Sequence, residues 1–305
     1  MSRILVIRGG ALGDFILTLP ALRLLREAFP GAHLEILGYS HIAGLAQLAA
    51  YADAVRSIES GLLAGFFARD GELGPELVEY FAGFQQVVSY LFDPDEIFAS
   101  NLRRAGVRNL ITGSPKITGE EHAARQLARP LEKLALHLED AAGWILPNEK
   151  RRVEPNLIAI HPGSGSETKN WPLPRFVQLA HRLLKEDEER RLLLIGGEAD
   201  CDRLRVLRGA LPDDRIEIAE NLPLIALAGE LGRCALFLGH DSGISHLAAA
   251  LGLPSVLLYG PTDPAIWAPQ NPRVRVLRAP CLTMSGIELD SVIMAVEERM
   301  RTERA

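Results

Sequence analysis

Short apolar runs alternate with amphipathic segments along the first half of the chain. Residues 3–8 contain an apolar run, Ile4-Leu5-Val6-Ile7, that predicts a buried strand, and apolar positions then recur at helical spacing from Asp14 through Leu25. Further strands are predicted at 33–37, 54–58, 86–90 and 107–111, with helices at 41–50, 75–83, 95–105 and 121–137. Strands that alternate with helices in this way predict a parallel sheet with helices on both faces.

The same alternation begins again after a polar stretch between Pro147 and Pro155, which has the composition of a linker and sets a predicted domain boundary near residue 152. Beyond it, strands are predicted at 157–161, 192–195, 216–218, 235–239, 255–259 and 274–277. Helices are predicted from Pro174 and at 200–209, 223–232, 243–252 and 286–303. The sequence therefore predicts an α/β protein with two doubly wound domains, 1–152 and 153–305.

Two segments of the first half fall outside this alternation. Residues 61–74 contain several glycines and two phenylalanines without a clear period, and they are predicted to form a mobile loop over a cleft. Asp93-Pro94-Asp95 looks like the D-x-D pair that holds a metal ion in many sugar transferases. Its proline, and its position before a predicted helix, favour a turn followed by a helix cap.

Composition narrows the class of protein. The chain has 305 residues, 48% of them hydrophobic and 24% charged, as expected for a soluble globular protein of about two domains. A net charge of −6 argues against a general nucleic-acid binder. Cys201, Cys234 and Cys281 are far apart, which suits a reducing compartment. No run approaches the roughly 20 apolar residues of a membrane span, so a cytoplasmic protein with at most peripheral membrane contact is expected.

A glycine loop follows the first predicted strand. The dinucleotide fingerprint G-x-G-x-x-G is broken here, because Gly10 and Gly13 supply its last two glycines while Arg8 stands where the first should be. An NAD-dependent oxidoreductase is therefore disfavoured. Asp14 begins the next predicted helix, where a carboxylate commonly caps the helix. A carboxylate at this position is also well placed to take a proton from a substrate hydroxyl.

A polar cluster follows the apolar run at 236–238. Ser242 or Asp241 can cap the helix that follows, and the free N–H groups of that helix favour an anion. Gly243 lets a phosphate approach the backbone, while Asp241 offers an acceptor for hydroxyls and His246 a possible cation. The cluster predicts a site for a sugar diphosphate. A capped turn with a histidine on the helix face is the alternative.

Two more strand ends in the second half carry polar, glycine-rich loops. The loop 161–172 combines glycines and hydroxyls with Lys169, a set suited to phosphate oxygens, although Lys169 can also be an ordinary solvated lysine. Glu198 follows a glycine pair and can accept from ribose hydroxyls, although a surface glutamate is the commoner case. Because the carboxyl ends of parallel strands share one edge of a sheet, the three loops are predicted to converge.

Four motifs, in this order, resemble the ADP-heptose:lipopolysaccharide heptosyltransferases, glycosyltransferase family nine. They are Gly13-Asp14 with Thr18-Leu19-Pro20-Ala21-Leu22; His161-Pro162-Gly163 with Lys169 and Trp171-Pro172; Gly239-x-Asp241-Ser242-Gly243-x-Ser245-His246; and Tyr259-Gly260-Pro261-Thr262-Asp263-Pro264. The resemblance implies a GT-B fold, with two Rossmann-like domains facing across a cleft. It places the acceptor on the first domain and the sugar nucleotide on the second, and it implies that the last helix, about 286–303, packs back toward the first domain.

The resemblance also implies roles for individual residues. Asp14 matches the general base, and Lys169 and Ser164 match residues that hold the diphosphate. The ribose contact matches Glu198, and Leu222 lies near the adenine-binding backbone. Sugar and phosphate contacts match Asp241, Gly243 and His246, and the predicted donor-binding set is completed by Gly13 and Ser242.

The acceptor side departs from the family pattern. Family members usually have a strand that ends in aspartate about a third of the way along the chain, whereas residues 87–95 here read Val-Val-Ser-Tyr-Leu-Phe-Asp-Pro-Asp. Basic residues nearby can meet anionic groups of an acceptor, although a solvated helix face is the simpler interpretation. These residues are Arg103, Arg104, Arg108, Lys116, Arg125 and Arg129.

The leading hypothesis is an inverting, metal-independent glycosyltransferase without a cofactor. It moves heptose or a similar sugar from a nucleotide diphosphate donor, expected to be ADP-heptose, to the lipopolysaccharide core or another saccharide, lipid-linked or soluble. It is expected in the cytoplasm, with peripheral contact at the inner membrane. The alternative is a catalytically silent family member that binds a nucleotide sugar or acts as a scaffold.

Overall fold

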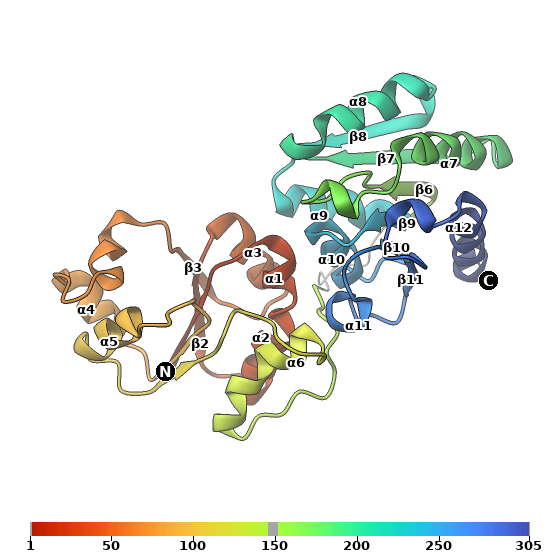
Figure 1. The fold of residues 1–305 in the computed structure, drawn as a ribbon. Helices are drawn as coiled ribbons and strands as arrows, with labels where there is room; N and C mark the ends of the chain where they lie inside the picture. The colour runs from red at the N-terminus through yellow and green to blue at the C-terminus, as the bar shows by residue number, and fades with distance from the viewer. Residues whose placement is uncertain (1, 146–151, 305) are drawn as a thin grey trace. The chain divides into compact units, whose positions relative to one another are not determined.

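The computed structural model describes residues 2–145 and 152–304. The chain divides into two compact units, residues 1–141 and 142–305 (Figure 1). The division lies upstream of the predicted boundary near residue 152, because residues 143–145 already belong to the second unit. The N–H of Ile145 donates to the carbonyl of Ala250 (2.7 Å), and the amide of Asn271 donates to the carbonyl of Gly143 (2.8 Å). Residues 146–151 of the predicted linker lie outside the described residues.

The first unit contains a five-stranded parallel sheet in the order β3-β2-β1-β4-β5. Its central strand β1 is the apolar run at the start of the chain, and Leu5, Val6 and Ile7 are completely buried. Burial on both faces explains why this strand is a continuous apolar run. The strands are β1 (Arg3–Arg8), β2 (His33–Gly38), β3 (Ala54–Ser57), β4 (Gln86–Ser89) and β5 (Leu110–Thr112).

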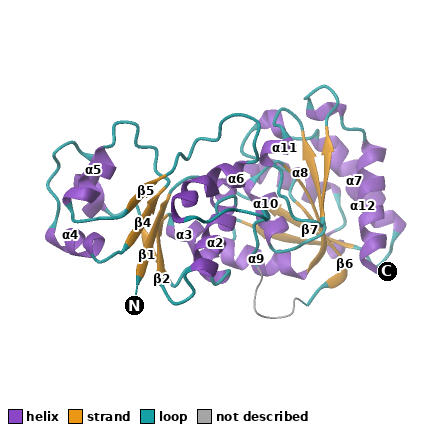
Figure 2. Ribbon diagram, turned by 90° about the horizontal axis from the view of Figure 1, so that it is seen from below, coloured by secondary structure: helices purple, strands orange, loops and turns teal. Residues whose placement is uncertain are grey.

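Helices cover both faces of this sheet. In Figure 2, α4 and α5 lie on one face, and α2, α3 and α6 lie on the other. The helices are α1 (Leu12–Ile16), α2 (Leu19–Ala28), α3 (Ser40–Leu48), α4 (Pro75–Ala82), α5 (Ile97–Arg104) and α6 (Ala123–Ala128). The order of strands and helices confirms the predicted doubly wound unit.

Three predictions for the first unit were wrong in detail. The helix predicted from Asp14 through Leu25 is split into α1 and α2, because Pro20 lacks an N–H and is suited to the first turn of a new helix. The helix predicted at 121–137 is likewise α6 followed by a 3₁₀ helix, Arg129–Leu134, with Pro130 in its first turn. The predicted strand at 107–111 forms later, as β5.

The predicted mobile loop at 61–74 contains a 3₁₀ helix, η1 (Gly61–Phe67), and is fixed to the core at that helix. Leu63 and Phe66 are buried in the cluster formed with α4 and α5. The side-chain amide of Asn101 also donates to the carbonyl of Phe66 (2.9 Å) and to that of Ala68 (2.9 Å). The prediction failed because these anchors come from a helix more than thirty residues further along the chain.

The turn-and-cap interpretation of Asp93 is confirmed. Its Oδ1 accepts from the N–H of Phe98 (3.2 Å) and its Oδ2 from the N–H of Ala99 (2.9 Å), at the start of α5. Both carboxylate oxygens therefore satisfy helix N–H groups that would otherwise have no partner inside the helix.

The second unit contains a six-stranded parallel sheet in the order β11-β10-β9-β6-β7-β8. Its strands are β6 (Glu154–Ile160), β7 (Arg191–Gly196), β8 (Ile216–Glu220), β9 (Cys234–His240), β10 (Ser255–Tyr259) and β11 (Val274–Arg278). The chain adds strands outward from β6 to β8, then returns to place β9 on the other side of β6. This reversal makes the carboxyl ends of β6 and β9 the topological switch point, where open α/β sheets bind ligands.

The helices of the second unit are α7 (Leu173–Glu186), α8 (Cys201–Ala210), α9 (Leu224–Arg233), α10 (Gly243–Ala250), α11 (Pro264–Trp267) and α12 (Leu289–Arg304). The last of these, α12, packs on α7, β9 and β10 of its own unit, through buried residues that include Val292 and Val296. Its predicted approach to the first unit stays a prediction. No helix within the described ranges is long and apolar enough to cross a bilayer.

Candidate functional site

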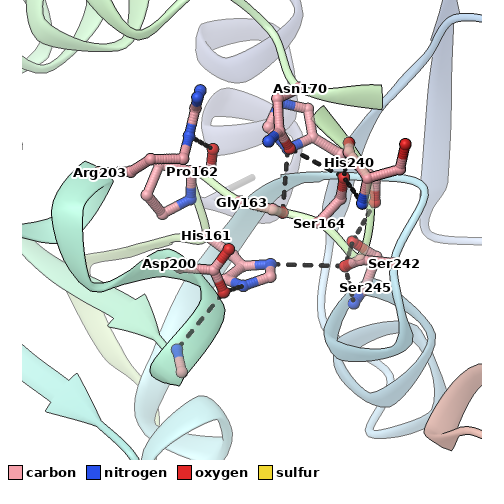
Figure 3. Close-up of polar contacts among 12 residues, drawn as sticks. His161, Pro162, Gly163, Ser164, Asn170, Asp200, Arg203, His240, Ser242 and Ser245 are labelled. Carbon is pink, nitrogen blue, oxygen red and sulfur yellow. Dashed lines mark hydrogen bonds and ion pairs between the residues drawn. The ribbon is translucent and has the colours of Figure 1, made fainter. Parts of the chain in front are cut away.

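The loops that follow β6, β7 and β9 are joined directly by hydrogen bonds at the switch point (Figure 3). The Nε2 of His161, after β6, lies 3.2 Å from the Oδ2 of Asp200, after β7. The Nδ1 of the same ring lies 3.4 Å from the Oγ of Ser242, after β9. The predicted convergence of the three loops at one edge of the sheet is therefore confirmed.

Lys169 and Asp241, both predicted site residues, form an ion pair. The Nζ of Lys169 lies 2.7 Å from the Oδ2 of Asp241, which also accepts from the Oγ1 of Thr262 at 2.7 Å. Asp241 is buried, whereas the ammonium of Lys169 belongs to a half-buried side chain. Lys169 therefore presents a positively charged group beside a carboxylate that can accept from hydroxyls. Burial, together with the nearby Asp241 carboxylate, raises the pKa of the neighbouring Tyr259 hydroxyl well above its ordinary value.

His240, which was not among the predicted site residues, fixes the loop 161–172. Its Nε2 accepts from the N–H of Trp171 (2.8 Å), so its Nδ1 carries the proton and donates to the carbonyl of Gly163 (3.1 Å). Complete burial lowers the pKa of His240 to about 3, although the hydrogen bond to Gly163 acts in the opposite direction. The only sequence signal for this role was the position of His240 at the end of a strand.

The neutral state of His240 predicts a pH dependence of stability. In the unfolded chain the ring binds a proton below about pH 6.5, whereas the folded ring does so only near pH 3. Unfolding therefore takes up a proton in this window, and the free energy of unfolding falls as the pH decreases from about 6.5 toward 3, by up to ~1.4 kcal/mol per pH unit.

The pH dependence can be measured by thermal or urea unfolding between pH 7 and pH 4. His240→Gln is the matched control, because glutamine can accept from the N–H of Trp171 but does not titrate. We expect the unmodified protein to have the steeper loss of stability, by about 1 kcal/mol per pH unit. Equal slopes in the two proteins would contradict the conclusion that His240 stays neutral in the folded protein over this pH range.

Arg203 and Trp171 hold the two ends of the same loop. The Nε of Arg203 donates to the carbonyl of Pro162 (2.7 Å), and its Nη2 donates to the carbonyl of Trp171 (2.7 Å). The indole Nε1 of Trp171, which is completely buried, donates to the carbonyl of Ile287 (2.9 Å). Neither residue was predicted to support the site in this way, because their partners are more than thirty residues distant in sequence.

Gly163 allows the pair of His161 and Asp200 to form. A Cβ atom at this position would lie 1.7 Å from the Oδ1 of Asp200, closer than real contacts allow. Burial alone would raise the pKa of Asp200, but the hydrogen bond and charge of His161, together with the N–H of Gly197 and the charge of Arg203, outweigh it, so the pKa is lowered. The carboxylate is thereby held ionised against the histidine ring.

Gly163→Ala is expected to lower the free energy of unfolding by about 1–3 kcal/mol, the usual cost of forcing extra volume into a packed site. Gly165→Ala is the matched control in the same loop, since a Cβ atom there would meet no atom within 4 Å. Urea unfolding of both variants measures the difference. Equal stability of the two would show that Asp200 can move aside without cost.

Ser242 caps α10 as predicted, because its Oγ accepts from the N–H of Ser245 (3.3 Å). Gly243 is the first residue of that helix. His246 lies further along α10 and is buried, with 4% of its surface exposed. Its predicted role as a cation in the site stays a prediction.

The remaining predicted donor residues lie at the same edge of the sheet but away from these contacts. Ser164 is bonded within its own loop, with its Oγ 2.8 Å from the Oδ1 of Asn170 (Figure 3). Glu198 follows β7 and Leu222 follows β8, and the side chains of both are exposed. Their positions at strand ends suit ligand contacts, and their individual roles stay predictions.

In the first unit, the side chain of Asp14 caps its own short helix, and the backbone carbonyl of Asp14 accepts a hydrogen bond from Arg8. The Oδ2 of Asp14 accepts from the N–H of Ala11 (3.2 Å). Arg8, only 3% exposed, donates to the carbonyl of Asp14 (3.1 Å) and to the hydroxyl of Thr18 (3.0 Å). Burial lowers the pKa of Arg8. The cap is thus confirmed, while the partly exposed carboxylate keeps access for the predicted base role. Gly13 precedes it within α1.

A cavity of about 250 Å³ opens in the first unit at the carboxyl ends of β4 and β5. Its wall combines hydroxyls, such as those of Ser89 and Thr112, with the exposed ring of Phe92. The Nζ of Lys116 lies 3.9 Å from the centroid of that ring. The cavity coincides with the stretch 87–95, where the sequence departs from the family pattern, and it is the candidate acceptor side.

Most of the basic residues considered for an anionic acceptor have partners in their own unit. Arg103 pairs with Glu96 (3.4 Å), and Arg129 pairs with Glu121. Arg104 donates to the Oδ1 of Asn101 (2.6 Å), and Arg125 donates to the carbonyls of Leu138 and Glu139. These four side chains have structural roles, which favours a solvated helix face over contacts with an anionic acceptor.

Comparison with known proteins agrees with the motifs. A model of glycosyltransferase family 9 (heptosyltransferase) matches residues 105–288. Lipopolysaccharide heptosyltransferase 2 of Salmonella typhimurium is 29% identical over 171 residues, which cover 52% of this chain and 47% of that protein. Three other curated heptosyltransferases align over 36% of their own lengths. The chain therefore spans less than half the length of these relatives.

Solved structures establish the fold. A family 9 glycosyl transferase from Veillonella parvula has a TM-score of 0.78 at 22% identity, over 99% of this chain and 97% of that one. The E. coli heptosyltransferase WaaC with ADP has a TM-score of 0.74 at 20% identity, over 97% and 99%. The predicted GT-B class, with two parallel-sheet α/β domains, is confirmed. Because the family model covers more than half of the chain, the protein belongs to glycosyltransferase family 9, the heptosyltransferase family.

Proposed function

We propose that the protein is an inverting, metal-independent glycosyltransferase that moves heptose or a similar sugar from a nucleoside diphosphate donor to a saccharide acceptor. Membership of family 9 supports the reaction class. The name of the Salmonella relative supports an acceptor in the lipopolysaccharide core, and the ADP in the WaaC structure supports ADP-heptose as the donor. The observation that carries the proposal is the ion pair of Lys169 and Asp241 at the switch point of the second unit.

The diphosphate of the donor is proposed to bind beside Lys169. Bond cleavage leaves negative charge on this group, and without a metal ion the protein has to supply the compensating charge. Lys169 supplies an ammonium, and the first N–H groups of α10 point toward an anion placed at Ser242. The loop 161–172 is rigidly held by His240 and Arg203, so these groups are aligned before the reaction begins.

Asp241 is proposed to bind the transferred sugar. A carboxylate accepts hydrogen bonds from hydroxyls, and Asp241 has one oxygen already occupied by Lys169 and Thr262. The same residue pair would then contact both sides of the bond that breaks, with the ammonium on the diphosphate and the carboxylate on the sugar. Glu198 and Leu222 are the proposed ribose and base contacts.

Asp14 is proposed to act as the general base. Its carboxylate takes the proton from the acceptor hydroxyl while that oxygen attacks the anomeric carbon of the sugar. A new C–O bond forms as the bond to the diphosphate breaks, and the nucleoside diphosphate leaves with both electrons of that bond. Attack from the face opposite the leaving group inverts the configuration at the anomeric carbon.

A screen of nucleotide sugars tests the proposal. ADP-heptose, UDP-glucose and GDP-mannose, each with a saccharide acceptor mixture that includes lipopolysaccharide core fragments, are assayed for nucleoside diphosphate release. We expect release with ADP-heptose and none of comparable rate with the others. Tight donor binding without turnover in any mixture would instead indicate the catalytically silent alternative. Release that requires an added divalent cation would refute metal independence. A cytoplasmic location with peripheral membrane contact belongs to the same proposal.

A further inference from the structure

A buried pair of side chains contacts the hydroxyl of a half-buried serine at the edge of the sheet. His161 and Asp200 are 3% and 7% exposed, and the contact between His161 and Ser242 extends this pair to a side chain that is only half-buried (Figure 3). The three residues come from the ends of β6, β7 and β9. Contacts run from the carboxylate of Asp200 to the imidazole of His161 and on to the hydroxyl of Ser242, which is nearest to the first turn of α10.

Asp200 determines how the imidazole is oriented. Its Oδ2 contacts the His161 ring and also lies 3.4 Å from the N–H of Gly197, so the carboxylate is fixed by the backbone of its own loop. Gly163 has no Cβ and therefore leaves room for this carboxylate. When one ring nitrogen of a histidine is held by a carboxylate, the direction of the other nitrogen is fixed as well. Here that other nitrogen faces Ser242.

The remaining contacts of Ser242 leave its hydroxyl few orientations. Its Oγ accepts from the N–H of Ser245 (3.3 Å) and lies 3.2 Å from the Oγ of Ser245. The Oγ of Ser245 in turn donates to the carbonyl of His240. Helix capping alone would need only the first of these contacts. The additional contact between His161 and the Oγ of Ser242 is explained by a hydroxyl that has to point in a defined direction.

We propose that His161 is a positioning residue: held by Asp200, it donates from its Nδ1 to the Oγ of Ser242, which leaves the hydroxyl hydrogen of Ser242 to be donated to the diphosphate of the donor. The inference rests on the proposed function, since it assigns the hydroxyl to the same diphosphate as Lys169. His161 acts through Ser242 and does not itself contact the donor. Its contribution to affinity therefore depends on the presence of the serine hydroxyl.

Two amide substitutions of His161 separate its two contacts. His161→Asn keeps a polar atom near the position of Nδ1, facing Ser242, and loses the contact with Asp200. His161→Gln keeps a polar atom near the position of Nε2, facing Asp200, and loses the contact with Ser242. A purely structural link between strands depends on Asp200, whereas a positioning role depends on Ser242, so the two roles predict opposite orders of affinity.

The measurement is the dissociation constant of ADP, UDP and GDP by calorimetry, using whichever binds the unmodified protein most tightly. We expect His161→Gln to weaken binding about tenfold, the effect of one hydrogen bond to a charged group, and His161→Asn to remain within about twofold of the unmodified protein. In a Ser242→Ala background, His161→Gln should change the constant by less than about twofold. Thermal unfolding of each variant confirms that it is folded.

Two results would overturn the inference alone: a greater loss in the Asn variant than in the Gln variant, or an undiminished loss in the Ser242→Ala background. If the unmodified protein binds none of the three nucleoside diphosphates, the proposed function fails and this inference fails with it. The two failures are therefore distinguishable in one set of titrations.

Discussion

Asp14→Asn is expected to lower the turnover of sugar transfer at least ~100-fold, the lower range for loss of a general base, while binding of the nucleoside diphosphate persists. The amide oxygen of asparagine can still accept from the N–H of Ala11, so the cap on α1 is kept. Asparagine cannot take a proton from the acceptor hydroxyl. Initial rates of nucleoside diphosphate release and calorimetric titration of the same diphosphate measure the two quantities.

Asp14→Ala provides the control for the cap. Alanine removes both the base and the contact with Ala11, so any loss of stability beyond that of the Asn variant reports the cap, typically about 0.5–2 kcal/mol. We expect the two variants to transfer sugar equally slowly. Unchanged turnover in Asp14→Asn would remove Asp14 from the mechanism, and loss of diphosphate binding in the same variant would make it a binding residue instead.

Lys169→Met is expected to lower turnover by about 100- to 1,000-fold, the usual effect of removing one group that stabilises charge in the transition state. Methionine has a similar length and no charge, so the leaving diphosphate loses its ammonium partner. We also expect the diphosphate to bind at least ~10-fold more weakly, as a hydrogen bond between charged groups is lost. The same rate assay and titration measure both effects.

Lys185→Met is the matched control, because Lys185 is an exposed lysine on α7 of the same unit. This variant changes the net charge equally and should transfer sugar at the unmodified rate. Thermal unfolding of Lys169→Met is needed as well, since Asp241 retains Thr262 but loses its cation. Similar rates in both lysine variants would exclude a specific role for Lys169.

Most of the strands were predictable, because their cause is local. A parallel strand covered by helices on both faces is a short continuous apolar run, as in 3–8 and 235–239, and such a run is visible in the sequence alone. The helix boundaries were less predictable than the strands, because Pro20 and Pro130 start new helices inside stretches that keep helical spacing. The order at 61–67 could not be predicted, because its anchors belong to α5.

The residues of the candidate site were also predictable only in part. Lys169 and Asp241 were predictable from residue type, since a lysine in a glycine loop and an aspartate at a strand end suit a diphosphate and a sugar. The residues that hold the loop were not. His240 reaches a backbone N–H 69 positions earlier in the chain, and Arg203 reaches two carbonyls in the loop before it. Such contacts depend on strand order, which no local pattern contains.

The carboxylate held 2.7 Å from Lys169 also affects which anions can use this lysine. A partner on the same chain competes at a high effective concentration, so a small free anion such as inorganic phosphate gains little by displacing it. A molecule that carries both a diphosphate and a hydroxylated ring can satisfy the ammonium and the carboxylate together. We therefore expect the pair to discriminate against abundant simple anions and to favour ligands that bind both of its members at once.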